Sequence, residues 1–220
     1  MPIPESAPRN RWLGAVRILL AGGVLAVIAH AYLLVVAAGD PNPFDYFGYF
    51  TNLTGVLTCG ALLTSGAIQL SGRPEPNGLT LARGVAVACM LIVGVVYNVL
   101  VPGTGSAPPW VSAILHIAFP ALVLLDWLVF APSAPPRWRE LWAILPYPLL
   151  WLAVVLVRGA TDGWVPYGFL LPERGPASLL VHIAGLLAAL LVAGALVWAA
   201  ARVAVPRHRS DPQNRPAASR

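Results

Sequence analysis

Six long apolar segments separated by short polar gaps constrain this chain more than any other feature. The segments cover residues 12–38, 48–70, 80–101, 110–130, 140–157 and 178–201. A helix needs about 20 apolar residues to cross the hydrocarbon core of a bilayer, and each segment is close to that length. The segments are continuously apolar and do not alternate, so helices are expected rather than barrel strands. The sequence therefore predicts an all-α polytopic membrane protein built as a bundle of six transmembrane helices.

The composition supports the same class. The chain is 58% hydrophobic and only 10% charged, whereas a soluble domain carries about a quarter charged residues. This much apolar surface cannot be buried within the chain, so the lipid bilayer is the expected partner. Cys59 and Cys89 lie inside two of the expected spans and form neither a disulfide framework nor a metal-thiolate spacing. No cofactor is implied.

The distribution of arginine predicts the orientation of the chain. All fourteen basic residues are Arg, and twelve of them lie at the chain ends, in the gaps after the second and fourth segments, or just inside the neighbouring segment ends. Arg158 and Arg174 are the two on the other side. The positive-inside rule then places both termini in the cytoplasm, in a multi-pass protein of the cell membrane. The net charge of +5 indicates contact with anionic lipid headgroups, and no nucleic-acid partner is expected.

The segments form one transmembrane domain, residues 12–205. A cytoplasmic N-terminal segment, 1–11, precedes it, and a basic, proline-rich tail, 206–220, follows it and is expected to be disordered. The longest gap, 158–177, contains aromatic side chains that suit a membrane interface. We favour an aromatic belt over a lid for this gap. The sequence gives no oligomeric state.

Three ionisable residues lie near the cytoplasmic ends of the spans. They are Arg17, Arg83 and Asp126. A charge within a span is expensive, so each needs a compensating partner. We expect Asp126 to pair with Arg83 or Arg17. A stabilising pair is favoured over a proton or ion pathway, because the interiors of the spans offer no further acid to continue one.

Polar residues also converge near the opposite boundary. All lie within roughly 12 Å of that boundary at the rise of an α-helix. They are His30, Thr51, Asn52, Tyr97, Asn98, His116, Arg158 and His182. This layer predicts a polar pocket that opens outward from the bundle.

Thr51 and His116 are the pair in this layer that could act as a nucleophile and its base. A threonine hydroxyl becomes a useful nucleophile only when a base takes its proton, and histidine is the usual base near neutral pH. The remaining residues, Asn52, Tyr97, Asn98, Arg158, His30 and His182, are candidates for binding substrate or stabilising an oxyanion. The structural alternatives stay open, because threonine in a membrane helix usually bonds its own backbone carbonyl and a lone histidine often bridges two helices.

Several motifs together resemble a known family. They are Tyr49-Phe50-Thr51, Leu115-His116 followed by Pro120 and Leu125-Asp126-Trp127, Arg158-Gly159-Ala160, and the stretch from Gly163 to Phe169. On these motifs, residues 44–198 resemble the Pr-six-Pr family of bacterial six-helix membrane proteins. That family is in turn similar to the androgen-induced family of transmembrane threonine hydrolases.

The resemblance implies an activity. Androgen-induced family members cleave fatty acid esters of hydroxy fatty acids with a Thr on helix two and a His on helix four. Carried over, this makes Thr51 the nucleophile, His116 the base and a membrane lipid ester the substrate, with no metal. The sequence departs from the family at Thr54-Gly55, where a Ser-Asn pair is usual. Asn52 or Asn98 would then have to replace the missing Asn.

Two other functions remain open from the sequence. A metal-dependent membrane hydrolase would use His30, His116 and His182 as three zinc ligands, although no His-x-x-x-His pair or nearby Glu supports it. A non-catalytic protein that binds lipids or small molecules, or acts as a scaffold, is the stronger alternative. The lack of inverted repeats weakens a transporter assignment.

Overall fold

A computed structural model of the protein describes residues 11–103, 107–132 and 134–204. The elements are α1 (Arg11–Ala37), α2 (Pro43–Gly48), α3 (Phe50–Leu70), α4 (Asn77–Leu100), α5 (Pro109–Ala113), a π-helix η1 (Ile114–Ala118), α6 (Phe119–Val129), η2 (Trp138–Ile144), α7 (Pro146–Thr161), η3 (Gly168–Leu170), η4 (Pro172–Arg174) and α8 (Pro176–Ala204). In the described part of the chain every regular element is helical, which confirms the all-α class.

Among the described residues, six helical units are long and apolar enough to span a membrane. The fourth joins α5, η1 and α6, and the fifth joins η2 and α7. The largest difference from the predicted boundaries is at the end of the fifth span, predicted at 157 and observed at Thr161. The prediction of a multi-pass membrane protein is therefore confirmed. The predicted N-terminal segment up to residue 10 and the predicted tail 206–220 lie outside the described residues.

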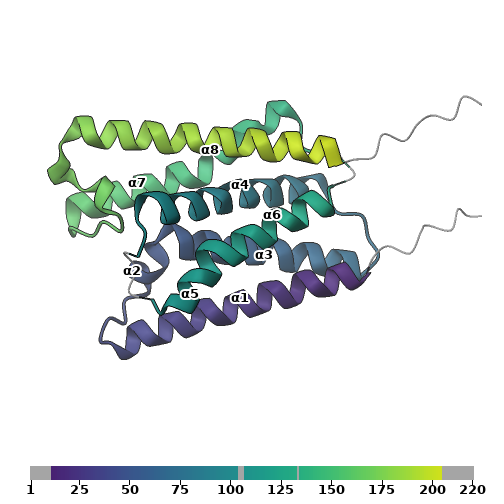
Figure 1. Ribbon diagram of the computed structural model, residues 1–220, viewed down its shortest axis with the longest axis horizontal. Helices are drawn as coiled ribbons and strands as arrows, with labels where there is room; N and C mark the ends of the chain where they lie inside the picture. The colour runs from purple at the N-terminus through teal and green to yellow at the C-terminus, as the bar shows by residue number, and fades with distance from the viewer. Residues whose placement is uncertain (1–10, 104–106, 133, 205–220) are drawn as a thin grey trace, which may run out of the picture.

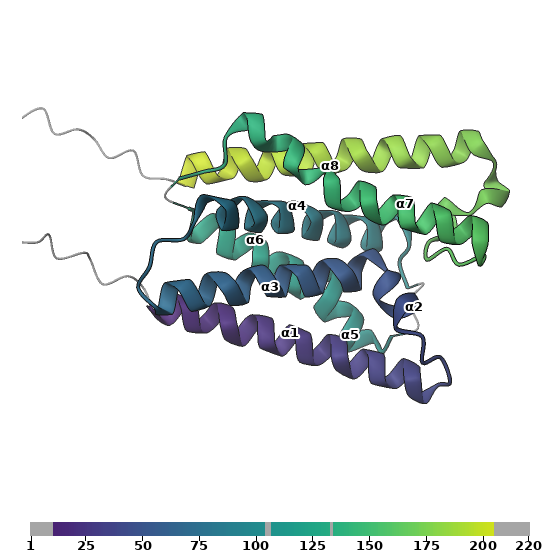
Figure 2. The ribbon, with the colours of Figure 1, turned by 180° about the vertical axis from the view of Figure 1, so that it is seen from behind.

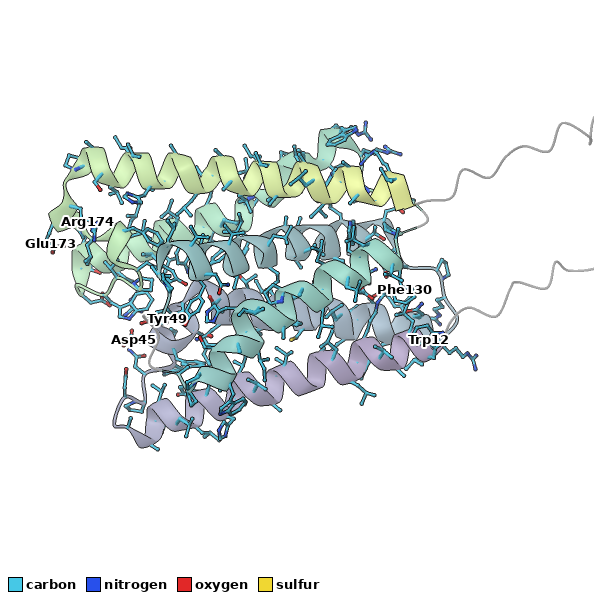
Figure 3. All side chains as sticks on the ribbon, in the orientation of Figure 1. Trp12, Asp45, Tyr49, Phe130, Glu173 and Arg174 are labelled. Atoms are coloured by element: carbon cyan, nitrogen blue, oxygen red, sulfur yellow. The ribbon has the colours of Figure 1, made fainter. Side chains whose placement is uncertain are left out.

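The two ends of the described chain leave the same end of the bundle, as an even number of spans requires (Figure 1). We call this the terminal end. The opposite end, which we call the loop end, carries α2 and the loop of residues 162–175. Trp12 and Phe130 mark the terminal end, and Asp45 and Glu173 mark the loop end (Figure 3). The side chains described below fall into two groups, one near each end.

Helix α4 is central, since it packs against α3, α6, α8 and η2. Helix α1 lies along α3 on one side of the bundle, and α7 and α8 lie together on the other (Figure 2). The α1–α3 crossing is close because glycines meet there. A Cβ at Gly14 would lie 2.7 Å from the Gly66 carbonyl oxygen, and one at Gly66 would lie 2.7 Å from that of Gly14. Small residues allow such backbone contact between membrane helices, where van der Waals packing drives association.

The centre of the bundle is filled by large side chains whose polar atoms are paired. Trp127 and Trp198 are fully buried. The Trp127 indole donates to the Val197 carbonyl at 2.9 Å, and the Trp198 indole donates to the Arg137 carbonyl at 3.1 Å. These bonds tie α6 and the start of η2 to α8.

Candidate functional site

An apolar cavity of about 80 Å³ lies near the loop end of the bundle. Helices α3, α4, α7 and α8 and the 162–175 loop form its walls. The lining residues are Phe50, Thr51, Ile92, Val93, Val96, Tyr97, Val101, Pro148, Trp151, Leu152, Tyr167, Phe169, Ile183, Leu186, Leu187 and Leu190. Among them, hydroxyl groups come from Thr51, Tyr97 and Tyr167. The Trp151 indole N–H is already used, because it donates to the Gly48 carbonyl at 2.8 Å. The site is thus a hydrophobic cavity with three hydroxyl-bearing side chains in its wall.

The 162–175 loop, which we call the lid, borders this cavity through Tyr167 and Phe169. Phe169 and Leu170 are buried, and the Tyr167 ring stacks on the Phe169 ring at a centroid distance of 5.3 Å. Trp164 packs so closely on α2 that a Cβ at Gly48 would lie 2.4 Å from its ring. From sequence we favour an aromatic belt over a lid for this gap. The belt concerns the position of the loop relative to the bilayer and stays a prediction, while the structure shows Tyr167 and Phe169 in the cavity wall. The aromatic side chains fold back onto the bundle because they find apolar partners there.

An ion pair fastens the loop to α2. Arg158, near the end of α7, donates to Asp45 of α2 at 2.7 Å and to Asp162 at 2.9 Å. Its guanidinium also lies 4.2 Å from the centroid of the Trp164 ring. Arg158 was a candidate for substrate binding, yet its charge is satisfied by these two acids. Its position makes it a latch beside the lid rather than a group that lines the cavity.

Thr51 lies in the first turn of α3 and lines the cavity. Tyr167 lies beside it in the cavity wall. Burial raises the pKa of Tyr167 to about 12, although hydrogen bonding by the Thr51 side chain and by the backbone of Thr51 and Phe50 acts in the opposite direction. Tyr167 is therefore a neutral phenol at physiological pH, able to donate or accept a hydrogen bond but unsuited to act as a base.

His116 lies in the π-helical turn η1. Its Nδ1 is 3.0 Å from the Ser112 carbonyl oxygen and 3.2 Å from Ser112 Oγ. Because Ser112 Oγ donates to the Tyr97 hydroxyl at 2.6 Å, the consistent assignment places a proton on Nδ1 and leaves Nε2 as the unprotonated nitrogen. In a catalytic histidine the same tautomer holds the ring while Nε2 takes the proton.

Proline accounts for the irregular backbone around His116. Pro120 lacks the N–H that would bond the His116 carbonyl in a regular helix. Asn98 of α4 supplies a substitute, because its Nδ2 donates to the His116 carbonyl at 3.3 Å as well as to the Gly94 carbonyl at 2.7 Å. π-Helical turns are frequent at functional sites, which draws attention to this position. Asn98 therefore supports the backbone and does not line the cavity.

The structure separates the other predicted site residues. Asn52 donates to the Tyr46 carbonyl at 2.8 Å, which pins α3 to α2. His30 is exposed, with its ring centroid 5.6 Å from that of Trp110. His182 Nδ1 is 2.8 Å from the Ser178 carbonyl. Of the eight predicted residues, Thr51 and Tyr97 line the cavity.

His116 does not line the cavity, and among the described residues no hydrogen bond joins it to Thr51. Tyr97 connects the two, because its ring lines the cavity and also stacks on His116. The three histidines of the metal hypothesis are not brought together. Within ranges 11–103, 107–132 and 134–204, no group of three His, Cys, Asp or Glu side chains is arranged to hold a metal ion.

A second polar group, the ionic cluster, lies near the terminal end. Asp126 of α6 accepts from Arg17 Nε at 2.9 Å and from Arg83 at 2.6 Å. The predicted pairing of Asp126 is therefore confirmed, with both arginines rather than one. Glu75, in the α3–α4 loop, accepts from Arg83 at 3.0 Å and from Ser65. Two buried cations thus face two carboxylates, so the cluster is electrically balanced.

The sequence argument missed Glu75, Tyr167 and Ser112. Glu75 lies outside the spans, so a search for charges within spans passes over it. Tyr167 and Ser112 are uncharged. They lie in a loop and in a short helix, where the sequence does not predict which residues they contact. Comparison of the chain with protein-family models, with curated proteins and with solved structures gave no match.

Proposed function

We propose that this protein is an integral membrane hydrolase of lipid esters, with Thr51 as the nucleophile. The observation that carries the proposal is Thr51 in the wall of a largely apolar cavity that the 162–175 loop borders. Apolar walls with a few placed polar groups are typical of ligand sites. The lining suits the alkyl chain of a fatty acid, and the ester carbonyl would lie at the hydroxyl end. With both termini in the cytoplasm, this cavity faces the outer leaflet of the cell membrane.

In the proposed reaction the Thr51 oxygen attacks the ester carbonyl and His116 takes its proton. The collapse of the intermediate gives an acyl-enzyme, and His116 returns the proton to the leaving alcohol. A water molecule then releases the fatty acid by the same steps. The bond between His116 Nδ1 and the Ser112 carbonyl supports this role, since it leaves Nε2 unprotonated. Tyr97 and Tyr167 are the hydroxyl donors nearest to the developing oxyanion.

The mechanism requires one rearrangement. Thr51 and His116 must come within hydrogen-bond or one-water reach when substrate is bound, and catalytic contacts often tighten only in that complex. Tyr97 is the side chain that would move, because it contacts both the cavity and the His116 ring. Displacement of Tyr167 from Thr51 by the substrate would free the nucleophile.

Non-catalytic lipid binding is the second candidate function, and two observations favour it. The Tyr167 phenol lies beside Thr51 in the cavity wall, and His116 lies outside the residues that line the cavity. A protein that holds a fatty acid or lipid chain for sensing or scaffolding needs the cavity and lid but no activated hydroxyl.

One experiment separates the two candidates. The purified protein in lipid nanodiscs is incubated with a fluorophosphonate probe and, separately, with a fatty acid ester of a hydroxy fatty acid. Hydrolysis and labelling at Thr51, retained in Thr51→Ser and lost in Thr51→Ala, support the hydrolase. Thr64→Ala is the matched control, because Thr64 lies on the same helix with an exposed side chain. Saturable binding of a radiolabelled fatty acid, without labelling or turnover, would replace the hydrolase proposal with the binding function.

A further inference from the structure

A second, smaller cavity adjoins the ionic cluster, well away from Thr51. Its volume is about 10 Å³, and Thr58, Arg83 and Asp126 contribute its polar wall. Aliphatic side chains and alanines form the rest. A site of roughly 10–15 Å³ is large enough for one water molecule, provided that polar partners surround it. This cavity therefore meets the size and the polarity that a single buried water requires.

Thr58 supplies an independent observation. Its side chain is 1% exposed, and its Oγ1 has no hydrogen-bond partner among the described residues. Threonine in a helix usually bonds the carbonyl four residues earlier, and Thr64 of the same helix does so with Gly60 at 2.8 Å. Thr58 instead presents its hydroxyl to the cavity. A buried hydroxyl without a partner is costly, so the site calls for a ligand that can bond to it.

The charges around the cavity select the ligand. A cation would approach Asp126 and Thr58 but would face the Arg83 guanidinium in the same wall. An anion would be attracted by Arg83 but repelled by the Asp126 carboxylate. A neutral molecule with both donors and acceptors avoids both penalties. Since the volume admits one small molecule, water is the ligand that fits.

We infer that this cavity binds one structural water molecule that bridges Thr58 Oγ1 to the Asp126 carboxylate. Each Asp126 oxygen accepts one bond from an arginine, and a carboxylate oxygen has capacity for a second. Through this water, the polar network of the ionic cluster reaches Thr58, further along α3. It also adds a polar link between α3 and α6.

The sign of a stability change tests the inference. Thr58→Val keeps the shape of the side chain and replaces the hydroxyl with a methyl group. If the hydroxyl is bonded to water, its loss lowers the midpoint of thermal unfolding of the full-length protein in nanodiscs, by about 2–4 °C for a loss near one hydrogen bond. If the hydroxyl is simply unsatisfied, the same change leaves the midpoint unaltered or raises it, and the inference fails. Thr58→Ser keeps the hydroxyl and should keep the water, although the loss of a buried methyl group lowers its midpoint as well.

Thr64→Val is the matched control, because this exposed threonine bonds only within its own helix. Its midpoint should change little. A high-resolution experimental structure gives the second measurement. Density for a single atom within 3.2 Å of Thr58 Oγ1 and of Asp126, absent in Thr58→Val, supports the water. A midpoint that depends on sodium rather than choline, or on chloride rather than gluconate, would overturn it in favour of an ion.

Discussion

The ring of Tyr97 stacks on the imidazole of His116, with centroids 3.5 Å apart and ring planes 12° from parallel. The same tyrosine lines the cavity that contains the Thr51 hydroxyl, and its own hydroxyl accepts a bond from Ser112. One side chain therefore contacts both the proposed base and the substrate cavity. In the proposed mechanism, contact between Thr51 and His116 depends on movement of this tyrosine when a ligand enters.

The first prediction concerns the catalytic pair. His116→Ala should lower the rate of ester hydrolysis by about 10²–10⁴-fold, which is the usual contribution of a general base. Thr51→Ala should abolish it, and the double variant should be no worse than Thr51→Ala alone, because nucleophile and base act as one unit. Rates are measured in nanodiscs, on variants whose unfolding midpoints match that of the wild type. Additive losses would show that the two residues act separately.

Tyr97 gives a second prediction within the same reaction. Tyr97→Phe keeps the stacked ring but removes the hydroxyl that accepts from Ser112. If Tyr97 only separates the cavity from His116, the variant retains the wild-type rate. If its hydroxyl stabilises the oxyanion, kcat falls by about 10²-fold or more while KM stays nearly constant. Steady-state kinetics on one ester substrate distinguish these results, and a rise in KM alone would assign Tyr97 to ground-state binding.

The α1–α3 crossing predicts a specific sensitivity to added volume. Gly66→Ala places a methyl group 2.7 Å from the Gly14 carbonyl oxygen, so the helices must separate. We expect a loss of about 1–3 kcal/mol in the free energy of unfolding, the range for overpacking. Gly60→Ala is the matched control on the same helix, because a Cβ there meets nothing within 4 Å. Equal stability of the two variants would contradict the close contact.

The ionic cluster predicts a loss of stability in acid. Burial by itself would raise the pKa of Glu75, but the Arg83 charge and the hydrogen bonds from Ser65, Arg83 and Thr80 lower it below the usual value for a glutamate. A carboxyl whose pKa is depressed by folding stabilises the protein above its unfolded-state value and loses that contribution as the pH falls through the folded-state value. The wild type should therefore lose stability as the pH falls below about 4.5.

Glu75→Gln removes this titration. At pH 7 the variant should be less stable by about 1–3 kcal/mol, somewhat under the cost of breaking a fully buried pair because the Glu75 side chain is 20% exposed. Its unfolding midpoint should fall less steeply with acid than that of the wild type. Arg73, an exposed neighbour in the same loop, provides the control Arg73→Gln, which should leave the acid dependence unchanged.

Sequence reasoning recovered the spans and the Asp126 pairing because both depend on depth in the membrane. Depth follows directly from residue number along a straight helix. The direction in which a side chain points around the helix axis does not follow from residue number, because it depends on how the neighbouring helices pack. His30 shows the difference. It has the depth expected for the outer polar layer, but α1 buries Val24, Ile28 and Ala31 against the bundle. His30, two residues from Ile28, is turned away and exposed.

The candidate site was only partly predictable for the same reason. Thr51 and Tyr97 share a depth in the sequence, and both line the cavity because α3 and α4 pack against each other. The separation of His116 from the cavity depends on the π-helical turn and on the stacked Tyr97 ring. The apolar pattern of this segment predicts a regular helix and does not predict the turn. Pro120, four residues after His116, does indicate that the backbone is irregular there.

The proposed orientation can be checked with single cysteines. Asn77→Cys lies near the terminal end and Glu173→Cys near the loop end, and both native side chains are exposed. With the termini in the cytoplasm, an impermeant thiol reagent added to intact cells should label position 173 but label position 77 only after lysis. The native Cys59 and Cys89 are buried, at 0% and 1% exposure, and should give little background. Labelling of position 77 alone in intact cells would reverse the orientation.

The last prediction concerns the latch beside the lid. The Arg158–Asp45 pair joins α7 to α2, with a distance of 2.7 Å, and Trp164 of the lid lies on the Arg158 guanidinium. Asp45→Asn removes the charge of the pair, worth about 0.2–1 kcal/mol at a partly exposed site, so the lid should open up to about five-fold more often. Asp40→Asn is the matched control, because Asp40 is exposed and bonds the Asn42 backbone rather than Arg158. Hydrogen exchange of backbone amides in the 162–175 loop measures the opening. Faster exchange in Asp45→Asn than in Asp40→Asn supports the latch. Equal exchange would show instead that the aromatic contacts of Trp164, Tyr167 and Phe169 hold the lid closed without the ion pair.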